Sequence, residues 1–296
     1  MITVMGATGN TGKKITERLL EDGEEVRALG RSEEKLAGFK HAGAEVLTGD
    51  AADAAFLTKA FRGADAVYTL LPPSVQSHDY RGEQNRQGEA ITKAIRESGV
   101  RYVVALSSLG ADVAEGTGLL VGLHAQEERL RQLKDANVLL LRPASFFENF
   151  YTMLDLIKHQ GVIGNTLPPD VAIPMVATRD IADVAAQTLQ ARDWKGVVVR
   201  ELLGPRDLTY SEATRIIGKH IGRPDLKYVQ LSYDDMAKGL RQAGMSENFV
   251  GLFIEMTRAF REGKVKPRAG RTSENTTPTR FEDFAGEFAH AYAEAA

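Results

Sequence analysis

The sequence opens with Met1-Ile-Thr-Val-Met-Gly-Ala-Thr-Gly-Asn-Thr-Gly12, and this stretch decides the fold. An apolar run ends at Gly6, further glycines follow at Gly9 and Gly12, and an amphipathic helical pattern begins immediately afterwards. A strand, a glycine-rich turn and a helix in this order form the first unit of a dinucleotide-binding fold. The pyrophosphate of such a ligand lies against the free N–H groups and the positive dipole end of the helix. The residues expected to contact it are Gly6, Thr8, Gly9, Asn10, Thr11 and Gly12.

The spacing of these glycines separates the turn from other phosphate-binding loops. It reads G-x-x-G-x-x-G, which is one residue longer at its start than G-x-G-x-x-G. A P-loop is disfavoured because five residues separate Gly6 from Gly12, and because Lys13 is followed by Lys14 rather than by Ser or Thr. Spaced glycines also occur in ordinary strand-to-helix turns, but the position directly between a strand and a helix favours nucleotide binding.

The composition is that of an ordinary globular protein of 296 residues, with 43% hydrophobic and 26% charged residues. The formal charge of −3 and the pI near 6.1 give no reason to expect a nucleic-acid partner. No apolar run is long enough to span a bilayer, and the first residues form a core strand rather than a signal peptide, so no membrane partner is expected. The absence of cysteine excludes disulfides and thiolate chemistry, and the six histidines lack metal-ligand spacing, so no metal is expected. We expect a cytoplasmic protein.

Apolar runs and helical patterns alternate through the first half of the chain. Runs such as Val138-Leu-Leu-Leu141 are apolar throughout, as are strands of a parallel sheet that is buried on both faces. The predicted strands are 2–5, 25–29, 44–48, 65–71, 101–107 and 137–141. The predicted helices between them are 11–22, 32–42, 53–62, 79–98 and 123–135. This alternation predicts an α/β fold with a doubly wound parallel Rossmann sheet.

The alternation stops after the sixth predicted strand. The elements expected beyond it are a helix over 146–160, loops and short strands over 161–174, a helix over 178–191 and a strand over 197–201. Capping boxes that begin at Thr209 and Ser232 open helices in the remainder. We therefore expect a Rossmann domain over residues 1–155, to which residues 178–203 return, and a smaller, mostly helical C-terminal domain over residues 156–296 that binds the substrate.

Arg31 follows the second predicted strand, nineteen residues after Gly12, where an NAD-dependent enzyme carries an acidic residue for the adenosine ribose. A guanidinium group can stack on adenine and pair with a 2′-phosphate, and Lys35 lies one turn further on. Two alternatives stay open: Arg31 is a solvated residue at a helix entry, or Glu33 or Glu34 accepts a hydrogen bond from a ribose hydroxyl group. The pattern favours NADP as the cofactor, with NADPH preferred to NADH.

Other expected cofactor contacts lie at the ends of the third, fourth and fifth predicted strands. Asp50 and Ala51 fall where the adenine lies, although Asp50 can equally cap the following helix. The residues expected beside the nicotinamide ribose are Leu70, Leu71 and Pro72. Ser107 ends the fifth strand and is expected to face the same crevice, either as a structural residue or as a catalytic one.

These residues together resemble the NmrA-like branch of the atypical short-chain dehydrogenases/reductases. Besides the glycine turn and Arg31, the motifs that carry the resemblance are Ser107-Ser108, His124-Ala-Gln-Glu-Glu128, Arg142-Pro143, Phe147-Glu-Asn149 and Thr178-Arg-Asp-Ile-Ala-Asp183. The tail, from Gly204-Pro-Arg-Asp-Leu-Thr209 to Phe281-Glu-Asp-Phe284, is similar to the bacterial quinone and triphenylmethane-dye reductases of this branch. The resemblance implies an NADPH-dependent oxidoreductase and adds Pro143 and His124 to the expected cofactor contacts.

The chain departs from the superfamily in its catalytic pair. Ordinary members carry Tyr-x-x-x-Lys, in which the lysine lowers the pKa of a tyrosine that exchanges a proton with the substrate. None of the eight tyrosines here is followed four positions later by lysine. Aligning His124-x-x-x-Glu128 with the family's Lys-x-x-x-Glu places Leu120 at the tyrosine position and His124 at the lysine position. His124 is then either a ribose contact or proton donor, or a helix-face histidine satisfied by a neighbour.

The missing pair limits the reaction. Hydride delivery to a plain ketone creates a basic alkoxide that needs a nearby acid, whereas a quinone or a cationic dye gives a stabilised product. We therefore expect hydride transfer from NADPH to an electron-poor conjugated acceptor, with Ser107 and His124 as candidate catalytic residues. The alternative is a regulator that binds NAD(P) and a protein partner without turnover. A nucleotide-sugar epimerase is disfavoured, because it too needs the missing tyrosine and lysine.

A cluster of aromatic residues after Pro143 is the candidate substrate pocket. The residues expected to wall it are Phe146, Phe147, Asn149 and Phe150, although such clusters more often form a hydrophobic core. A helix over 246–262 offers a second apolar face for core packing, for the pocket wall or for a subunit contact. The sequence is compatible with a monomer or a homodimer.

Overall fold

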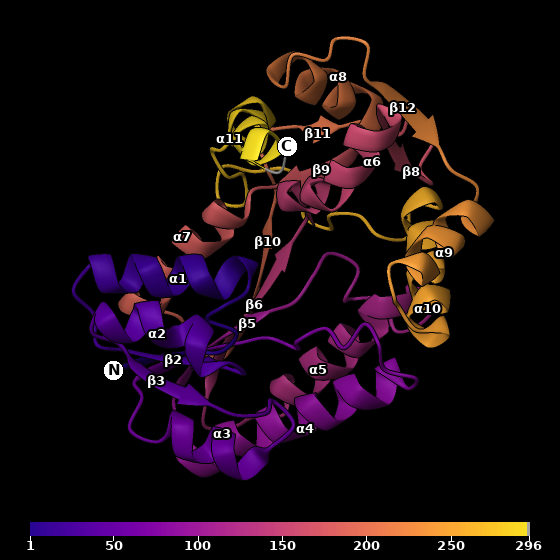
Figure 1. Ribbon diagram of the computed structural model, residues 1–296. Coiled ribbons are helices and arrows are strands. Elements are labelled where there is room, and N and C mark those ends of the chain that lie inside the picture. Colours follow the sequence, from indigo (N-terminus) through magenta and orange to yellow (C-terminus); the bar gives the residue numbers. More distant parts are fainter. Residues whose placement is uncertain (295–296) are drawn as a thin grey trace.

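A parallel sheet forms the centre of the computed structural model, which describes residues 1–294 (Figure 1). Its strands are β1 (Ile2–Val4), β2 (Val26–Gly30), β3 (Glu45–Thr48), β4 (Ala66–Thr69), β5 (Tyr102–Leu106), β6 (Asn137–Pro143) and β10 (Val197–Leu202). The seven strands lie in the order β10-β6-β5-β4-β1-β2-β3, and every neighbouring pair is parallel. From β1 the chain runs outward in both directions, so the doubly wound Rossmann prediction is confirmed.

Three helices pack on each face of the sheet. One face carries α1 (Asn10–Glu21), α2 (Glu33–His41) and α7 (Thr178–Ala191), and the other carries α3 (Ala54–Phe61), α4 (Tyr80–Ser98) and α5 (Val121–Arg131). Side chains alternate between these layers along each strand. On β5, Val104 packs in the layer of Ile15 from α1, and Val103 packs in the layer of Ile91 from α4. Both faces are therefore apolar, as the continuous apolar runs predict.

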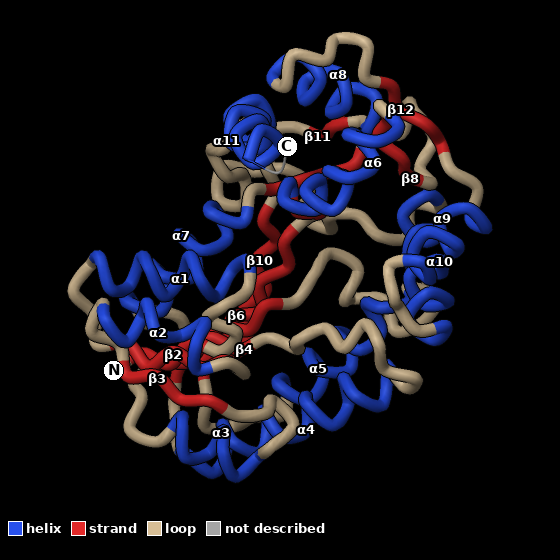
Figure 2. The backbone as a smooth tube through the Cα atoms, in the orientation of Figure 1, coloured by secondary structure: helices blue, strands red, loops and turns tan. Residues whose placement is uncertain are grey.

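The remaining elements lie beyond the carboxyl ends of the strands, where β6 and β10 point toward them (Figure 2). They are β7 (Ser145–Phe146), the 3₁₀ helix η2 (Phe147–Met153), α6 (Leu154–Gln160), β8 (Val162–Asn165), β9 (Ile173–Val176), β11 (Asp207–Leu208), α8 (Tyr210–His220), β12 (Lys227–Gln230), α9 (Tyr233–Gln242), α10 (Glu247–Arg261) and α11 (Phe281–Glu294). Thr209 and Ser232 cap α8 and α9 as predicted, by accepting from the backbone N–H groups of Glu212 and Asp235. Within residues 1–294, no helix is both long and apolar enough to cross a bilayer.

The single helix predicted over 146–160 is wrong. That segment begins with the short strand β7, continues as η2 and becomes α-helical only at Leu154. A 3₁₀ helix repeats every three residues, so Phe147 and Phe150 point the same way. Both rings are buried against Phe281 of α11, at centroid distances of 5.0 and 5.2 Å. Burial of two large rings at this spacing favours the tighter helix.

Two carboxylates tie the C-terminal elements to α7. Glu148 of η2 accepts a hydrogen bond from the backbone N–H of Thr178 at 3.0 Å. Asp180 accepts from the backbone N–H and the hydroxyl group of Thr279, at 3.0 and 2.6 Å, directly before α11. The Thr178–Asp183 motif therefore attaches the start of α7 to η2 and to the segment before α11, which both belong to the elements beyond the carboxyl ends of the strands (here called the upper layer).

Gly12 of α1 packs directly against the backbone of the turn that follows β1. A Cβ atom there would lie 2.2 Å from the carbonyl oxygen of Gly6 and 2.9 Å from that of Met5. Gly6 itself has φ +64°, a conformation that glycine adopts without steric cost. The turn can therefore hold α1 this close to the sheet only with glycine at both positions.

Replacing Gly12 with alanine is expected to destabilise the fold by about 1–3 kcal/mol, because backbone atoms rather than a flexible side chain must shift. The matched control is Gly38→Ala in α2, where an added Cβ atom meets nothing within 4 Å. That variant should gain about 0.5–1 kcal/mol from helix propensity. Urea unfolding of both variants measures the two values. A Gly12→Ala variant as stable as the wild type would contradict the packing argument.

Candidate functional site

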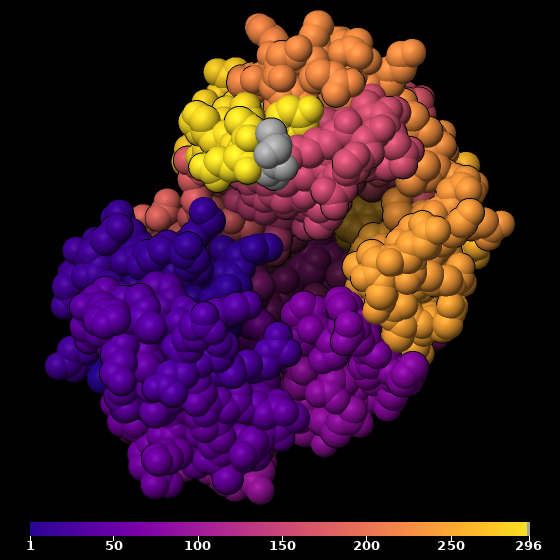
Figure 3. Space-filling view, viewed as in Figure 1, coloured from indigo at the N-terminus to yellow at the C-terminus, as the bar shows by residue number. Residues whose placement is uncertain are grey.

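A cavity of about 690 Å³ lies at the carboxyl edge of the sheet, within the roughly 300–1,000 Å³ range of small-ligand sites. It lies where β1 separates the strands that run outward on its two sides, which is the binding position in doubly wound sheets. The predicted cofactor residues that line it are Gly6, Thr8, Gly9, Asn10, Thr11, Arg31, Lys35, Asp50, Ala51, Leu70, Leu71, Pro72, Ser107 and Pro143. Figure 3 shows the surface hollowed between the N-terminal half and the C-terminal helices.

The glycine turn presents to this cavity a helix N-terminus that no side chain caps. The N-cap residue of α1 is Gly9, which has no side chain to satisfy the first N–H groups, and the first turn contains no acidic residue. These N–H groups and the helix dipole suit an anionic ligand. Gly12 does not line the cavity. Its close contact with Gly6 instead fixes the shape of the turn.

Tyr68 contacts the glycine turn through Thr11. Its hydroxyl group lies 2.9 Å from the hydroxyl group of Thr11, and the side chain is fully buried on β4. Burial raises the pKa of Tyr68 well above its usual value of 10, more than the hydrogen bond to Thr11 lowers it. Tyr68 is therefore a structural tyrosine and is not an acid available to the cavity.

Arg31 and Lys35 line the end of the cavity beyond β2. Both side chains are exposed, and neither forms an ion pair with any residue in the 1–294 range. Glu33 and Glu34 do not line the cavity. Ser32 caps α2 by accepting from the N–H of Lys35 at 3.3 Å. Two uncompensated cations thus face the place where the far ribose of a dinucleotide lies in this fold.

Asp50 makes a tight turn after β3 and does not cap α3. Its carboxylate accepts from the N–H of Ala52 at 2.9 Å, whereas Asp53 accepts from the N–H groups of Ala55 and Phe56 at the start of α3. Asp50 lines the cavity together with Ala51. Asp53, rather than Asp50, is therefore the residue that caps α3.

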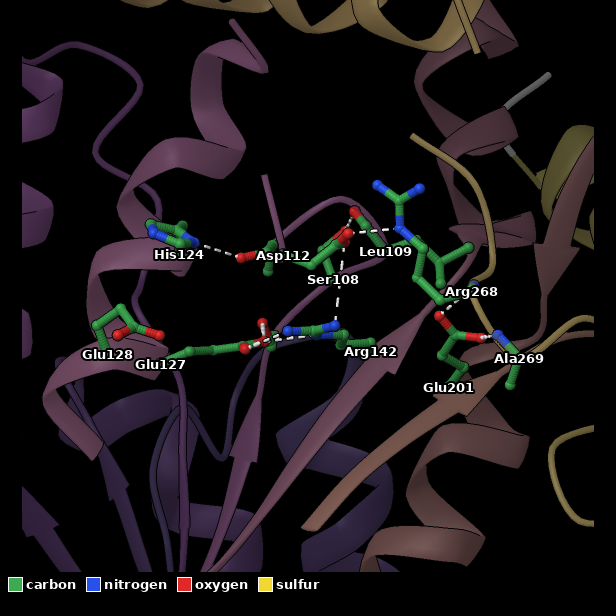
Figure 4. A network of polar contacts seen from close by, with 12 residues as sticks. Ser108, Leu109, Asp112, His124, Glu127, Glu128, Arg142, Glu201, Arg268 and Ala269 are labelled. Atoms are coloured by element: carbon green, nitrogen blue, oxygen red, sulfur yellow. Dashed lines mark hydrogen bonds and ion pairs between the residues drawn. The ribbon is translucent and has the colours of Figure 1, made fainter. Parts of the chain in front are cut away.

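Ser107 is joined to a buried ion pair, which Glu127 and Arg142 form and Figure 4 shows. Its hydroxyl group donates to Glu127 at 2.6 Å, and Arg142 donates to the same carboxylate at 2.8 and 2.5 Å. Glu127 is 2% exposed, and Arg131 adds a third partner at 3.1 Å. Burial opposes ionisation of Glu127, but the hydrogen bonds from Arg142, Ser107 and Arg131 outweigh it, so the pKa of this carboxyl group lies below its usual 4.5. Ser107 therefore presents its oxygen lone pairs to the cavity.

His124 does not reach the cavity. Its Nδ1 atom lies 2.8 Å from the carbonyl oxygen of Ala111, and it is not a lining residue. The buried glutamate of α5 is Glu127, whereas the side chain of Glu128 is 57% exposed. The residue one turn before Glu127 is Leu123, which does line the cavity. Leu123 and Glu127 thus lie one residue before His124 and Glu128, a rotation of about 100° on a helix.

The aromatic cluster divides between two environments. Phe146 lines the cavity, but Phe147 and Phe150 are each 1% exposed and pack in the core of the upper layer. Asn149 lines a second cavity of about 1290 Å³, which α6, α9 and α10 enclose. Of the four residues predicted to wall the pocket, the structure thus brings one to the crevice, one to the neighbouring cavity and two to the core.

Gln87 is a lining residue that the sequence reasoning missed. It is 3% exposed on α4, and its buried carbonyl oxygen has no hydrogen-bond partner among the residues of the 1–294 range. An unpaired buried amide is costly and marks a place where a ligand or water completes the hydrogen bonding. The available signal was its spacing, since Tyr80, Gln84, Gln87 and Ile91 fall on one helical face.

We expect Glu127→Gln to lose about 3–5 kcal/mol of stability at pH 7, because Arg142 is left buried without its carboxylate. The pKa of Glu127 is lowered by folding, so its stabilisation is complete above about pH 4.5 and is lost as the pH falls through the folded value. The stability gap between wild type and variant should therefore narrow below that pH. Urea unfolding from pH 7 to pH 3 measures it. Glu128→Gln is the control, with an expected change within about 0.5 kcal/mol, and a pH-independent gap would contradict the argument.

Comparison with known proteins identifies the family of this chain and solved structures that share its fold. A sequence profile of the NmrA-like family matches residues 1–285. A Streptomyces griseus protein named (4-alkanoyl-5-oxo-2,5-dihydrofuran-3-yl)methyl phosphate reductase is 29% identical over 99% of each chain. Solved structures with the same fold include an Escherichia coli NADPH-dependent quinone oxidoreductase complexed with NADPH, at TM-score 0.81 and 22% identity over 97% of this chain and 99% of that one. Another is the Citrobacter sp. triphenylmethane reductase complexed with NADP(H), at TM-score 0.77 and 22% identity over 98% and 100%. With nearly its whole length matched by the family profile, the chain belongs to the NmrA-like family.

Proposed function

We propose that this chain is an NADP(H)-dependent reductase that transfers hydride to an electron-poor conjugated acceptor. The observation that carries the proposal is the two-ended cavity at the carboxyl edge of the sheet. One end offers the open N-terminus of α1 and the cations Arg31 and Lys35. The other end is apolar and is lined by Leu120, Leu123 and Phe146.

The first end fits a phosphorylated dinucleotide. The turn from Gly6 to Thr11 would hold the pyrophosphate, and Arg31 with Lys35 would hold the 2′-phosphate. Two similar solved proteins are described as complexes with NADPH or NADP(H), which supports the same cofactor here. Ser107 and Pro143, at the ends of β5 and β6, would border the nicotinamide.

The second end favours acceptors that need no strong acid. The titratable side chains that line the cavity, within residues 1–294, are Arg31, Lys35, Asp50 and Glu83. Of the two carboxylates among these, Asp50 is used in a turn and Glu83 is paired with Arg86. The names of similar proteins point the same way, since they refer to a quinone, a triphenylmethane dye and an oxo-dihydrofuran.

The chain's own part in the reaction is to orient the acceptor beside the nicotinamide. When bound, NADPH would supply a hydride to a carbon of the acceptor. Leu120, Leu123 and Phe146 shield the transfer, while Ser107 is held by Glu127 with its oxygen toward the cavity. The electron pair that arrives on the acceptor spreads over its conjugated system, and water supplies the proton that completes reduction. His124 has no role in this scheme, because it lies outside the lining.

Purified protein should oxidise NADPH only when a conjugated acceptor such as a benzoquinone is added. With an unconjugated ketone, kcat/KM is expected to be at least about 100-fold lower, since a missing general acid costs about 10²–10⁴ in rate. The measurement is NADPH absorbance during an acceptor screen. Tight binding of NADP with no turnover on any acceptor would favour the regulator instead. Equal rates with ketones and quinones would contradict the argument from the missing acid.

The cofactor preference rests on Arg31. Arg31→Ala is expected to lower kcat/KM for NADPH by about 10- to 100-fold, the loss expected for charge-assisted hydrogen bonds of about 1.5–3 kcal/mol. The value for NADH should stay within about threefold. Lys40→Ala, on the helix α2 that follows Arg31 and outside the cavity, is the control. Equal losses with both coenzymes would refute the assignment of NADP.

A further inference from the structure

The second cavity lies directly beside the first and is larger than a single unsubstituted quinone ring would need. Its volume of about 1290 Å³ exceeds the roughly 300–1,000 Å³ of ordinary small-ligand sites. The elements around it are η2 and α6 on one side, α9 and α10 on the other, and β8 with β12 at its end.

The walls of this cavity are apolar helix faces that are only partly covered by packing against their neighbours. Met236 and Leu240 lie one turn apart on α9, and Phe253, Met256 and Phe260 share one face of α10. All five side chains are only half-buried. Apolar faces that meet across open space favour an apolar ligand between them.

Charged residues are confined to the rim of the cavity. Asp155 and His159 on α6 and Asp235 and Lys238 on α9 line it, and all four side chains are exposed. The interior therefore offers apolar contacts, and the charged groups remain in water.

Strand β7 lies between the two cavities. Successive residues of a strand point to opposite sides, and here Phe146 lines the first cavity while Ser145 lines the second. Phe146, Met256 and Phe260 also pack against the same core cluster. The two cavities therefore lie within the width of one strand of each other, close enough for one extended ligand to occupy both.

We propose that the second cavity binds an extended apolar chain, an alkyl or acyl substituent of the acceptor that is reduced in the first. The inference rests on the proposed function and specifies its substrate class. A chain fits better than a second fused ring because the wall is rich in methionine and leucine, which adapt to irregular shapes, and offers few flat surfaces for stacking. The acceptor is then a conjugated head with an apolar tail.

Acceptors that share one benzoquinone ring and carry no side chain, a butyl chain or a decyl chain test the proposal. KM should fall with chain length, by about tenfold or more from no chain to decyl, since each buried methylene contributes about fourfold. A polycyclic quinone of similar apolar area is compared in parallel. A lower KM for the polycyclic quinone together with no dependence on chain length would overturn the assignment of a chain.

Two glycines provide matched variants. Gly239 on α9 lines the second cavity and Gly251 on α10 does not, and at both exposed positions an added Cβ atom meets nothing within 4 Å. Gly239→Phe should reduce the KM advantage of the decyl acceptor by about fivefold or more, on the same methylene scale, and leave the bare ring unchanged. Gly251→Phe should change neither. An unaltered chain-length profile in Gly239→Phe would overturn the proposal.

Binding of a fluorescent dansyl-labelled undecanoic acid separates this inference from the proposed function. Wild type should bind the probe and Gly239→Phe should bind it at least about fivefold more weakly, on the same methylene scale. If no acceptor is reduced but the probe shows this pattern, the reductase proposal fails and the chain site stands. If quinones are reduced with one KM at every chain length and the probe does not bind, the reductase proposal stands and the chain site fails.

Discussion

The buried contact between Glu127 and Arg142 joins the parts of the site that come from different elements. Removing both charges from water costs several kcal/mol for each ion, and this cost is offset only when the remaining hydrogen-bonding capacity is also used. Here the carboxylate accepts from Arg142 through two nitrogens, from Ser107 and from Arg131. The arrangement positions β5, β6 and α5 relative to one another at the edge of the cavity. It also commits the Ser107 proton, so the group best placed to donate to an acceptor is already engaged.

The same guanidinium group continues into a chain of contacts that reaches the C-terminal segment (Figure 4). Arg142 lies 3.9 Å from Asp112, which pairs with Arg268 at 2.5 Å. Glu201 at the end of β10 accepts from the backbone N–H groups of Arg268 and Ala269, at 2.8 and 3.1 Å. The segment between α10 and α11 is therefore attached to the edge of the sheet through backbone groups. Because α10 precedes this segment and walls the second cavity, the position of that wall is tied to the strand ends that border the first.

Local chemistry explains what the sequence could predict. The turn from Gly6 to Gly12 needs glycine for steric reasons that act within seven residues, and the parallel strands are visible as apolar runs because both faces are buried. The failures arise from tertiary contacts. The helix expected over 146–160 begins as η2, because Phe147 and Phe150 are buried under Phe281, more than 130 residues away in sequence. His124 was misplaced because one residue on a helix changes the direction of a side chain by about 100°, which no pattern of His and Glu resolves.

The two cavities are lined by different parts of the chain, and this difference has a functional consequence. The dinucleotide cavity is lined mostly by strand ends and the turns that follow them, within residues 5–146. The second cavity draws its walls from 145–173, 210 and 229–260, and many of these residues lie on α6, α9 and α10. Substitutions on α9 and α10 can therefore alter the shape of the second cavity without disturbing the glycine turn or Arg31. A single fold can in this way keep one coenzyme while its acceptors change, with Phe146 on β7 as the only predicted pocket residue that borders the coenzyme cavity itself.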